Sequence, residues 1–557
     1  SIFDTPALDF RRNRADGDDL LGDAYEYLMR HFATQSGKSK GQFYTPAEVS
    51  RIMAKVIGVS GATSPDQAIY DPTCGSGSLL LKAHDEARSA TGLDLAIYGQ
   101  EMDNATRALA RMNMILHDAP SAEIWQDNTL STPHFTQPGS GALKTFDFVV
   151  ANPPFSTKAW SNGFDPANDR FGRFAYGIPP AKNGDYAFLL HILASLKSTG
   201  KGAVILPHGV LFRGGAEGAI RREIVRRGFI KGIIGLPANL FYGTGIPACI
   251  VVLDKEHAAT RQGIFMIDAS RGFRKEGDKN RLREQDIHRI VDTFTREQKI
   301  DRYSRMVPLD VIERNGYNLN LPRYIDSSEP EDIQDIEAHL RGGIPVRDIG
   351  ALDAYWKVFP GVRDALFAPV DDTGQRPNYR RLKVPAAEVK ATIFGQPEFA
   401  AFNSAVTTLF EQWVAAQRPR LHGIDIGDKP KALIHALSED LLETFRVAPL
   451  IDEYDVYQHL MDYWAETMQD DVYLLVQEGW TAMLDGEPNA DLIPPELVIR
   501  RYFAAEQAAI EQLEAERDAV MRQLEEMEEE HGGEDGLLAE AKTDKGRLTT
   551  KSLKERL

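Results

Sequence analysis

The middle of the chain alternates short apolar runs with longer stretches in which apolar residues recur at helical spacing. The short runs predict buried strands, and the periodic stretches predict helices between them. We expect strands at 68–70, 96–98, 146–151, 202–206, 230–235 and 249–253, and helices at 78–90, 104–116 and 186–196. Strands that alternate with helices indicate a mostly parallel sheet with helices on both faces, which is an α/β fold.

Both ends of the chain have helical patterns. An amphipathic helix is expected at 18–32, and the sequence beyond residue 331 is largely helical. Near its end a heptad pattern places Phe503, Ile510, Arg517 and Leu524 at one position and Glu506, Leu513, Val520 and Met527 at another. This pattern fits a short coiled coil, and it also fits an ordinary amphipathic helix packed on its own domain.

A chain of 557 residues is too long for a single hydrophobic core. The patterns divide it into an N-terminal helical segment (1–40), an α/β domain (41–330), a helical C-terminal domain (331–500) and a coiled-coil-like helix with a polar tail (501–557).

The distribution of charge changes what the net charge implies. The chain carries 64 basic and 82 acidic side chains, a net charge of −18, which at first argues against DNA as a partner. Residues 1–330 hold 40 basic and 38 acidic side chains, a net of +2, so residues 331–557 hold 24 and 44, a net of −20. The acidity belongs to the helical part, and the α/β part is free to contact nucleic acid.

Cysteine content and hydropathy indicate a cytoplasmic protein without a membrane span. Cys74 and Cys249 are too few for a disulfide framework, and no signal-peptide pattern opens the chain. Residues 232–253 are uncharged, but Pro237, Pro247 and several glycines interrupt them. We therefore expect two buried strands joined by a loop there.

The first candidate site is the turn Asp71-Pro72-Thr73-Cys74-Gly75-Ser76-Gly77, between a predicted strand and a helix. Its glycines let the backbone approach a ligand at the sheet edge where α/β folds bind cofactors. The next strand ends at Glu101, an acidic residue of the type that binds ribose hydroxyls. Asp127 lies further along the chain, where another strand of such a fold should end, and is placed to contact an adenine amine.

The second candidate site is Asn152-Pro153-Pro154-Phe155, directly after the strand at 146–151. The exocyclic amine of adenine is a poor nucleophile, so a site that alkylates it must accept its hydrogen bonds and orient it. The Asn152 side chain and the Pro153 carbonyl supply two acceptors, and Phe155 supplies a face for stacking an extruded base. The same four residues also fit a rigid turn without a chemical role.

In this order, the motifs resemble the amino-methyltransferases that use S-adenosylmethionine. With Gly41-Gln42-Phe43-Tyr44-Thr45-Pro46 ahead of the glycine turn, they resemble the modification (methyltransferase) subunit of type I restriction-modification systems, which methylates N6 of adenine in DNA. Further matches lie at 184–188, 206–212, 236–247 and 317–320, so the resemblance covers about 18–330. It implies a Rossmann-like methyltransferase fold followed by a helical region.

The resemblance also implies a role for each motif. The cofactor-binding residues would be Gln42, Phe43, Tyr44, Thr45, Pro46, Asp71, Gly75, Ser76, Gly77, Glu101 and Asp127, and the target base would be held by Asn152, Pro153, Pro154 and Phe155. Glu101 would bind the ribose of S-adenosylmethionine and Asp127 its adenine. No metal is expected, because a sulfonium leaves as a neutral thioether and the N6 proton can leave to water. In the loop after the base-binding turn, Arg170 and Arg173 are candidates for contacting DNA.

Several partners follow from the resemblance. The expected ones are double-stranded DNA, a specificity subunit bound through the helical C-terminal part, a second copy of the chain and a restriction or translocase subunit. Family members usually carry a larger N-terminal helical domain, so residues 1–40 are expected to be its remnant. Two alternatives stay open: an amino-methyltransferase acting on RNA or on a protein glutamine, and a non-catalytic assembly scaffold.

Three other features receive structural interpretations. His191 lies in an apolar helical pattern and is expected in the core, and no role is assigned to His208. A basic cluster fits either a solvated helix face or a phosphate-contacting strip. Its members are Arg221, Arg222, Arg226, Arg227 and Lys231.

Overall fold

A computed structural model of the chain describes residues 45–241, 245–277, 279–327, 333–371, 374–480, 483–484, 487–488, 495–531 and 554. The chain divides into two compact units, residues 1–423 with 427–467, and residues 424–426 with 468–557. The helix predicted at 18–32 lies outside the described residues, as do Gln42, Phe43 and Tyr44.

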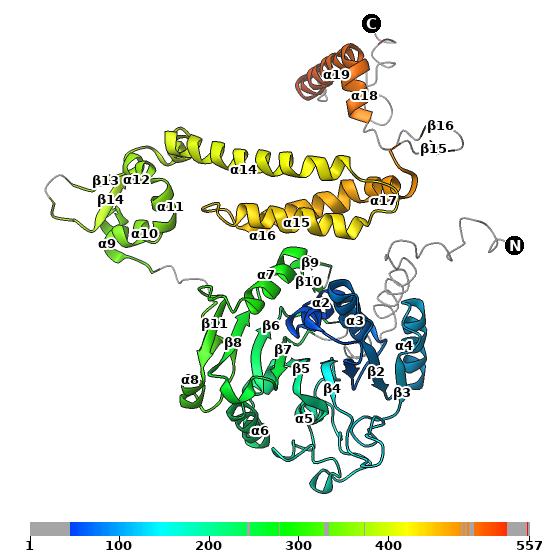
Figure 1. Cartoon of the computed structure of the whole chain (residues 1–557). Helices are drawn as coiled ribbons and strands as arrows, with labels where there is room; N and C mark the ends of the chain where they lie inside the picture. Colours follow the sequence, from blue (N-terminus) through cyan, green and yellow to red (C-terminus); the bar gives the residue numbers. More distant parts are fainter. Residues whose placement is uncertain are drawn as a thin grey trace. The chain divides into compact units, whose positions relative to one another are not determined.

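A sheet of nine strands forms the centre of the first unit, in the order β11-β8-β6-β7-β5-β4-β1-β2-β3 (Figure 1). Its strands are β1 (Ala68–Asp71), β2 (Ala96–Glu101), β3 (Glu123–Gln126), β4 (Phe146–Ala151), β5 (Leu196–Pro207), β6 (Ile230–Gly235), β7 (Ala248–Asp254), β8 (Gly263–Asp268) and β11 (Ser304–Pro308). All six expected strands are confirmed. The pairs from β3 through β2, β1 and β4 to β5 are parallel, whereas β7 runs antiparallel to both neighbours and β11 antiparallel to β8.

Helices cover both faces of this sheet, as the alternating pattern predicts. One face packs against α2 (Ala47–Val56), α3 (Ser78–Thr91), α4 (Asn104–Leu116) and α7 (Glu284–Thr295). The other packs against α5 (Asp185–Ser195), α6 (Gly215–Arg226) and α8 (Leu309–Arg314). A hairpin of β9 (Arg274–Glu276) and β10 (Lys279–Arg281) precedes α7. The three predicted helices correspond to α3, α4 and α5.

Local sequence explains where these helices begin. The Asp103 carboxylate accepts a hydrogen bond from the Thr106 amide at 2.8 Å and caps α4. α3 begins after Gly77, which has the left-handed φ of 78° that glycine tolerates best. Nearly every residue of α5 is buried, which explains its continuous apolar sequence.

The remainder of the first unit is mainly helical. Its long helices are α14 (Pro397–His422), α15 (Pro430–Phe445) and α16 (Glu453–Tyr463). Before them, β12 (Ile344–Pro345), β14 (Tyr379–Leu382) and β13 (Phe367–Pro369) form a small antiparallel sheet. Short helices accompany it: α9 (Ile336–Arg341), α10 (Val346–Gly350), α11 (Asp353–Val358), α12 (Pro360–Leu366) and α13 (Val389–Phe394). The sequence did not predict this sheet, because strands this short have no readable periodicity.

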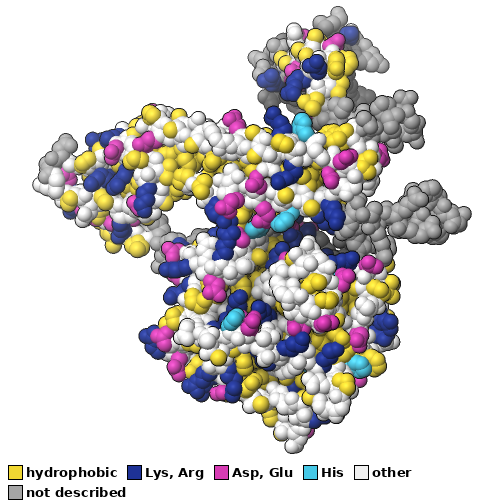
Figure 2. All heavy atoms as spheres, viewed as in Figure 1, with side chains coloured by type: hydrophobic (Ala, Val, Ile, Leu, Met, Phe, Trp, Pro, Cys, Tyr) yellow, Lys and Arg dark blue, Asp and Glu magenta, His cyan; other side chains and the backbone are white. Residues whose placement is uncertain are grey.

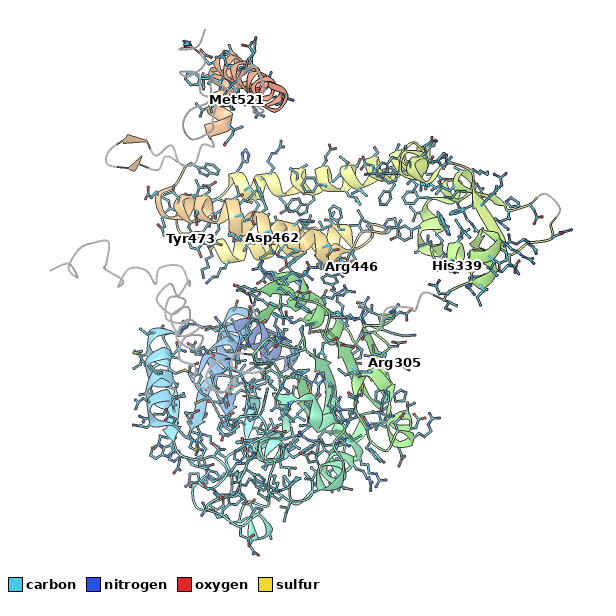
Figure 3. All side chains as sticks on the ribbon, turned by 180° about the vertical axis from the view of Figure 1, so that it is seen from behind. Arg305, His339, Arg446, Asp462, Tyr473 and Met521 are labelled. Atoms are coloured by element: carbon cyan, nitrogen blue, oxygen red, sulfur yellow. The ribbon has the colours of Figure 1, made fainter. Side chains whose placement is uncertain are left out.

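Polar side chains join α7 to the helices α15 and α16. His288 Nε2 lies 2.7 Å from a Glu439 oxygen, and Nε2 of the Gln285 side chain donates to Asp455 Oδ1 at 2.7 Å. Arg446, labelled in Figure 3 at the end of α15, lies 3.6 Å from the Asp292 carboxylate. The α/β part and the helical part of the first unit are thus connected by specific polar contacts.

The second unit contains α17 (Gln469–Glu478), a small hairpin of β15 (Met483–Leu484) and β16 (Glu487–Pro488), α18 (Pro495–Tyr502) and α19 (Ala504–His531). Apolar side chains of α19 are exposed, including Ile510 at 51%, Leu513 at 64% and Val520 at 53%. Among the residues that the structure describes, no helix is long and apolar enough to cross a membrane.

Gly232 in β6 provides a test of the packing between the sheet and α7. A Cβ added there would lie 2.5 Å from Phe294 Cε2 and 2.8 Å from the Phe265 carbonyl oxygen. Since both neighbours are buried, we expect Gly232→Ala to lower the free energy of unfolding by about 1–3 kcal/mol. Gly61→Ala, where no atom lies within 4 Å, is the control and should leave the thermal midpoint nearly unchanged. Equal midpoints for the two variants would contradict the packing described here.

Candidate functional site

The sequence motifs converge because four neighbouring parallel strands end at the same edge of the sheet. The strands lie in the order β4, β1, β2, β3, and each candidate motif follows the end of one of them. β1 connects through α3 to β2 on one side, while β4 pairs with β1 on the other side. Strand order therefore reverses at β1, and α/β folds bind ligands at such a switch point.

The glycine turn after β1 is held by its own polar groups. Asp71 Oδ1 accepts a hydrogen bond from the Thr73 amide at 2.8 Å, and the Gly77 amide donates to the Cys74 carbonyl at 2.7 Å. Gly75 has a φ of 54°, and a Cβ on Gly77 would lie 2.5 Å from Met114 Cε. Ser76 is buried, and its carbonyl accepts from Asn113 Nδ2 at 3.0 Å. The turn needs glycine for both conformation and space.

Glu101 links the glycine turn to the end of β2. One carboxylate oxygen accepts from the Gly75 amide at 3.1 Å and the other from the Asp103 amide at 2.9 Å. Burial raises the pKa of Glu101, against these backbone hydrogen bonds, which lower it. Burial likewise raises the pKa of Asp71 to about 8, with the Glu101 charge adding to the rise and the Thr73 hydrogen bonds opposing it. Two desolvated carboxyl groups thus lie at this edge.

The turn after β3 carries Asp127. Its amide donates to the Glu101 carbonyl at 3.0 Å, and its Oδ1 accepts from the Asn128 amide at 2.7 Å. Gln100, fully buried in β2, donates to the carbonyls of Asp127 at 3.3 Å and Thr132 at 2.9 Å. Sequence reasoning missed Gln100, although a polar residue inside an apolar strand was the available signal.

Asn152 follows β4 and is oriented by the segment that precedes α2. Its Nδ2 donates to Thr45 Oγ1 at 3.1 Å, which leaves Oδ1 on the opposite side of the amide. Thr45 is buried, and Pro46 is the N-cap residue directly before α2. The structure therefore brings together Thr45 and Asn152, which are 107 residues apart in sequence.

The turn after Asn152 is fixed by Asp185, to which sequence analysis assigned no role. The Ser156 amide donates to Asp185 Oδ1 at 2.7 Å, and Arg213 pairs with the other oxygen at 2.5 Å. Ser156 has a φ of 51°, which is uncommon for a residue with a side chain. Thr157 Oγ1 also donates to the Pro154 carbonyl at 2.9 Å. These bonds hold the backbone of the Asn-Pro-Pro-Phe turn.

Phe155 is partly buried beside the loop that follows β6. Its ring meets that of Phe241 edge to face, with centroids 5.9 Å apart. Pro153 is buried and Pro154 partly so. Phe241, which sequence reasoning did not single out, supports the ring that was expected to stack on the target base.

The two arginines expected to contact DNA differ sharply. Arg170 is exposed, with its guanidinium 4.4 Å from the centroid of the Phe171 ring. Arg173 is buried and pairs with Asp169 at 2.8 Å, with both side chains nearly inaccessible. The expectation that Arg173 contacts DNA is wrong, because its guanidinium is enclosed within the protein.

His191, His208 and the basic cluster, which the sequence singled out, contact other groups within the protein. His191 is confirmed as a core residue: burial, and secondarily the Arg173 charge, lower its pKa to about 3, so it is neutral. His208 Nε2 lies 3.0 Å from the Ala248 carbonyl, and burial lowers its pKa. Arg221 is buried and donates to the Tyr317, Val210 and Arg213 carbonyls, whereas Arg226 donates to the Tyr317 hydroxyl at 2.8 Å. Arg221 is therefore neither a solvated nor a phosphate-contacting residue.

The groups at this edge fit S-adenosylmethionine chemically. The Glu101 oxygens accept backbone hydrogen bonds from Gly75 and Asp103, and a carboxylate has further lone pairs that a ribose hydroxyl can use. Burial disfavours the ionised forms of Asp71 and Glu101, and a cationic ligand would stabilise them; this cofactor carries both an ammonium and a sulfonium group. The donor set at the edge is therefore compatible with this cofactor.

Comparison with known proteins agrees with the site. The sequence model of the family "N-6 DNA Methylase" matches residues 16–333, more than half of the chain. The chain is 33% identical over 333 residues to the MjaVII type I restriction enzyme methylase subunit of Methanocaldococcus jannaschii, covering 58% of this chain and 56% of that protein. It is 35% identical over 341 residues to the MpnII type I methylase subunit of Mycoplasma pneumoniae, covering 60% and 62%. The chain thus matches little more than half the length of these relatives.

A solved structure extends the similarity to the fold. The type I restriction-modification methyltransferase subunit of Streptococcus thermophilus is 39% identical, with a TM-score of 0.50 over 56% of this chain and 65% of that one. The predicted methyltransferase fold is confirmed by this likeness together with the mixed sheet and its two helical layers.

The raised pKa of Asp71 predicts a pH-dependent stability. Between its ordinary value of 3.8 and about 8, the folded chain keeps a proton that the unfolded chain has lost. The resulting stabilisation is complete below the unfolded pKa and is lost as the pH rises through the folded pKa. We expect the wild type to lose roughly 3 kcal/mol between about pH 6 and pH 9, and Asp71→Asn, which cannot ionise, to lose less. Thermal unfolding across this range measures both.

The exposed Asp66 supplies the control for this experiment. Asp66→Asn makes the same chemical change outside the site and should keep the pH slope of the wild type. Identical slopes for wild type and Asp71→Asn would show that Asp71 is already ionised in the folded chain.

Proposed function

Because the chain belongs to the N-6 DNA methylase family, we propose that it transfers a methyl group from S-adenosylmethionine to N6 of adenine in double-stranded DNA. In this proposal it is the modification subunit of a type I restriction-modification system, as its relatives are named. The observation that carries the proposal is the amide of Asn152, fixed by Thr45 at the strand end next to the glycine turn. We expect it to act on chromosomal DNA in the cytoplasm.

The base-binding residues would act by orienting a weak nucleophile. Asn152 Oδ1 and the Pro153 carbonyl accept hydrogen bonds from the N6 hydrogens and draw electron density toward nitrogen as the new bond forms. Phe155 offers a stacking face for an adenine turned out of the duplex. The bond from Asn152 Nδ2 to Thr45 keeps the acceptor oxygen in one orientation, so little reorganisation is needed. The N6 proton leaves to solvent after transfer.

The cofactor would be held along the same edge. Glu101 is assigned to the ribose and Asp127 to the adenine, while Asp71 and the turn Gly75-Ser76-Gly77 lie beside the methionine part together with Thr45 and Pro46. Gln42, Phe43 and Tyr44 keep the cofactor role proposed from the family resemblance. When bound, S-adenosylmethionine supplies the electrophilic methyl group. Residues of this chain then fix the distance and direction of approach.

DNA and protein partners complete the proposal. Arg170 is exposed in the loop after the base-binding turn and is assigned to the DNA backbone. A specificity subunit would bind through α18 and α19, where Figure 2 shows hydrophobic side chains among charged ones. Met521, labelled in Figure 3, is 51% exposed on α19. A second copy of the chain and a restriction or translocase subunit would complete such an assembly. The named relatives favour this activity over methylation of RNA or protein glutamine and over a scaffold.

Asn152→Ala tests the proposed chemistry. Removing the Asn152 side-chain acceptor should lower methyl transfer to adenine by at least about a hundredfold, because its orienting hydrogen bond to N6 is lost. Cofactor binding should stay within about threefold of the wild type, because Asp71, the glycine turn, Glu101 and Asp127 lie at the ends of other strands. Of the assigned cofactor residues that the structure describes, only Thr45 bonds to the Asn152 side chain. The assay follows tritiated methyl groups into N6-methyladenine in unmethylated DNA, with the specificity subunit present. Transfer at the wild-type rate would show that another turn holds the base.

Leu513→Asp with Val520→Asp tests the proposed partner surface. Both side chains are exposed on α19, so the changes should leave the chain folded but place charge in the expected seam. Recovery of the specificity subunit in copurification should fall at least about tenfold. The matched control, Gln512→Asp with Ala519→Asp, adds the same charge beside the seam and should retain the complex. If the Leu513→Asp, Val520→Asp variant recovers as much specificity subunit as the wild type, α19 is excluded as the attachment site.

A further inference from the structure

Arg173 makes an unusually complete set of hydrogen bonds for a buried cation. Nε donates to both oxygens of Asp169, at 3.2 and 3.1 Å, and Nη2 donates to Asp169 Oδ1 at 2.8 Å and the Leu130 carbonyl at 2.8 Å. Nη1 lies 3.4 Å from both the Thr129 carbonyl and His191 Nδ1. All five N–H groups of the guanidinium thus have an acceptor. The neutral state of His191 lets its ring nitrogen be one of them.

These acceptors belong to parts of the chain that bear different halves of the site. Thr129 and Leu130 lie in the turn that begins at Asp127, and Thr129 Oγ1 donates to the carbonyl of Pro72 in the glycine turn at 2.5 Å. Arg173 itself lies in the loop between the base-binding turn and Asp185. One side chain therefore connects the loop beside the target base to the turn assigned to the cofactor adenine.

Stability alone gives a weak reason for this arrangement. The guanidinium is enclosed by aromatic rings, with the centroids of Phe164, Phe171 and Phe174 between 5.2 and 5.4 Å away. Desolvating an arginine and an aspartate is expensive, and apolar residues of similar volume often stabilise a buried site as well or better. An apolar side chain cannot supply the planar donors of a guanidinium, which hold the turn that begins at Asp127 and the loop that carries Arg173 in a fixed arrangement.

We propose that Arg173 is a positioning residue that couples the cofactor site to the target-base site. It acts through the Asp127 turn on one side and through the loop after Phe155 on the other, and it touches neither reactant. This inference rests on the proposed methyltransferase function. Occupation of the cofactor site should therefore change the affinity for DNA, and loss of Arg173 should uncouple the two.

The first test is a double-mutant cycle on cofactor binding. The dissociation constant of S-adenosylmethionine is measured by calorimetry for the wild-type chain, Arg173→Met, Asp127→Ala and the double variant. We expect Arg173→Met to weaken binding about tenfold in the wild-type background but less than about twofold when Asp127 is absent, because it acts through that turn. Equal losses in both backgrounds, or no loss in either, would overturn the proposal.

Two further variants separate positioning from folding. Lys182→Met removes an exposed cation from the same loop and should bind the cofactor like the wild type. Arg173→Lys retains the charge beside Asp169 but has three donors and no planar fork, so it should weaken binding while its thermal midpoint stays near that of the wild type. Should Arg173→Met unfold, the cycle is run with Arg173→Lys. Wild-type cofactor binding by Arg173→Lys would overturn the proposal.

The second test measures coupling in the complex with the specificity subunit. DNA affinity is compared with and without S-adenosylhomocysteine, which needs no methyl transfer. The ratio of the DNA dissociation constants without and with S-adenosylhomocysteine should differ from one for wild type and Lys182→Met. It should be close to one for Arg173→Met. The same ratio in all three proteins would overturn the proposal. A wild type that fails to methylate adenine yet shows the non-additive cycle would refute the proposed function and leave the cofactor half of this inference standing.

Discussion

The parallel pairing of β1 with β4 is the constraint on which the site depends. Tyr70 of β1 pairs with Val149 of β4. β1 ends at Asp71 and β4 at Ala151, so the two strands end side by side. The turn after β1 and the turn at Asn152 are therefore neighbours, although about eighty residues separate them in sequence. A shift of this register would move Asn152 away from the glycine turn. Pairing of β2 with β1 then adds Glu101 to the same edge, and pairing of β3 with β2 adds Asp127.

Buried polar groups turn this edge into a defined site. Gln100, Asp185 and Arg173 are each almost fully buried, and each bonds to a loop that carries a candidate functional residue. A buried polar group without partners is costly, so each loop has one favourable arrangement in which these groups are satisfied. The loops acquire the rigidity that the proposed orientation of a weak nucleophile requires, without being part of the sheet.

Sequence patterns predict the strands and motifs of this fold better than they predict strand direction or the supports of the site. The apolar runs of β6 and β7 read the same in either direction, but the twelve-residue connection 236–247 contains no helical pattern, and a parallel crossover needs one. The antiparallel β7 was therefore readable. Arg173 was not, because an arginine in a polar loop looks solvent-exposed until Thr129, Leu130 and His191 are placed around it. Asp185 likewise gains its role only through contact with Ser156.

The uneven charge of the chain has a structural counterpart at α7. On this helix His288 contacts Glu439 of α15. Arg289 lies 3.3 Å from Asp452, the N-cap residue of α16. One turn before His288, Glu284 of α7 accepts hydrogen bonds from the two terminal guanidinium nitrogens of Arg51 in α2, at 2.7 and 2.8 Å. Because α2 begins two residues after Thr45, the segment that orients Asn152 and the acidic helical part both bond to α7. The excess acidity of the helical part is thus partly a complement to basic side chains of the α/β part.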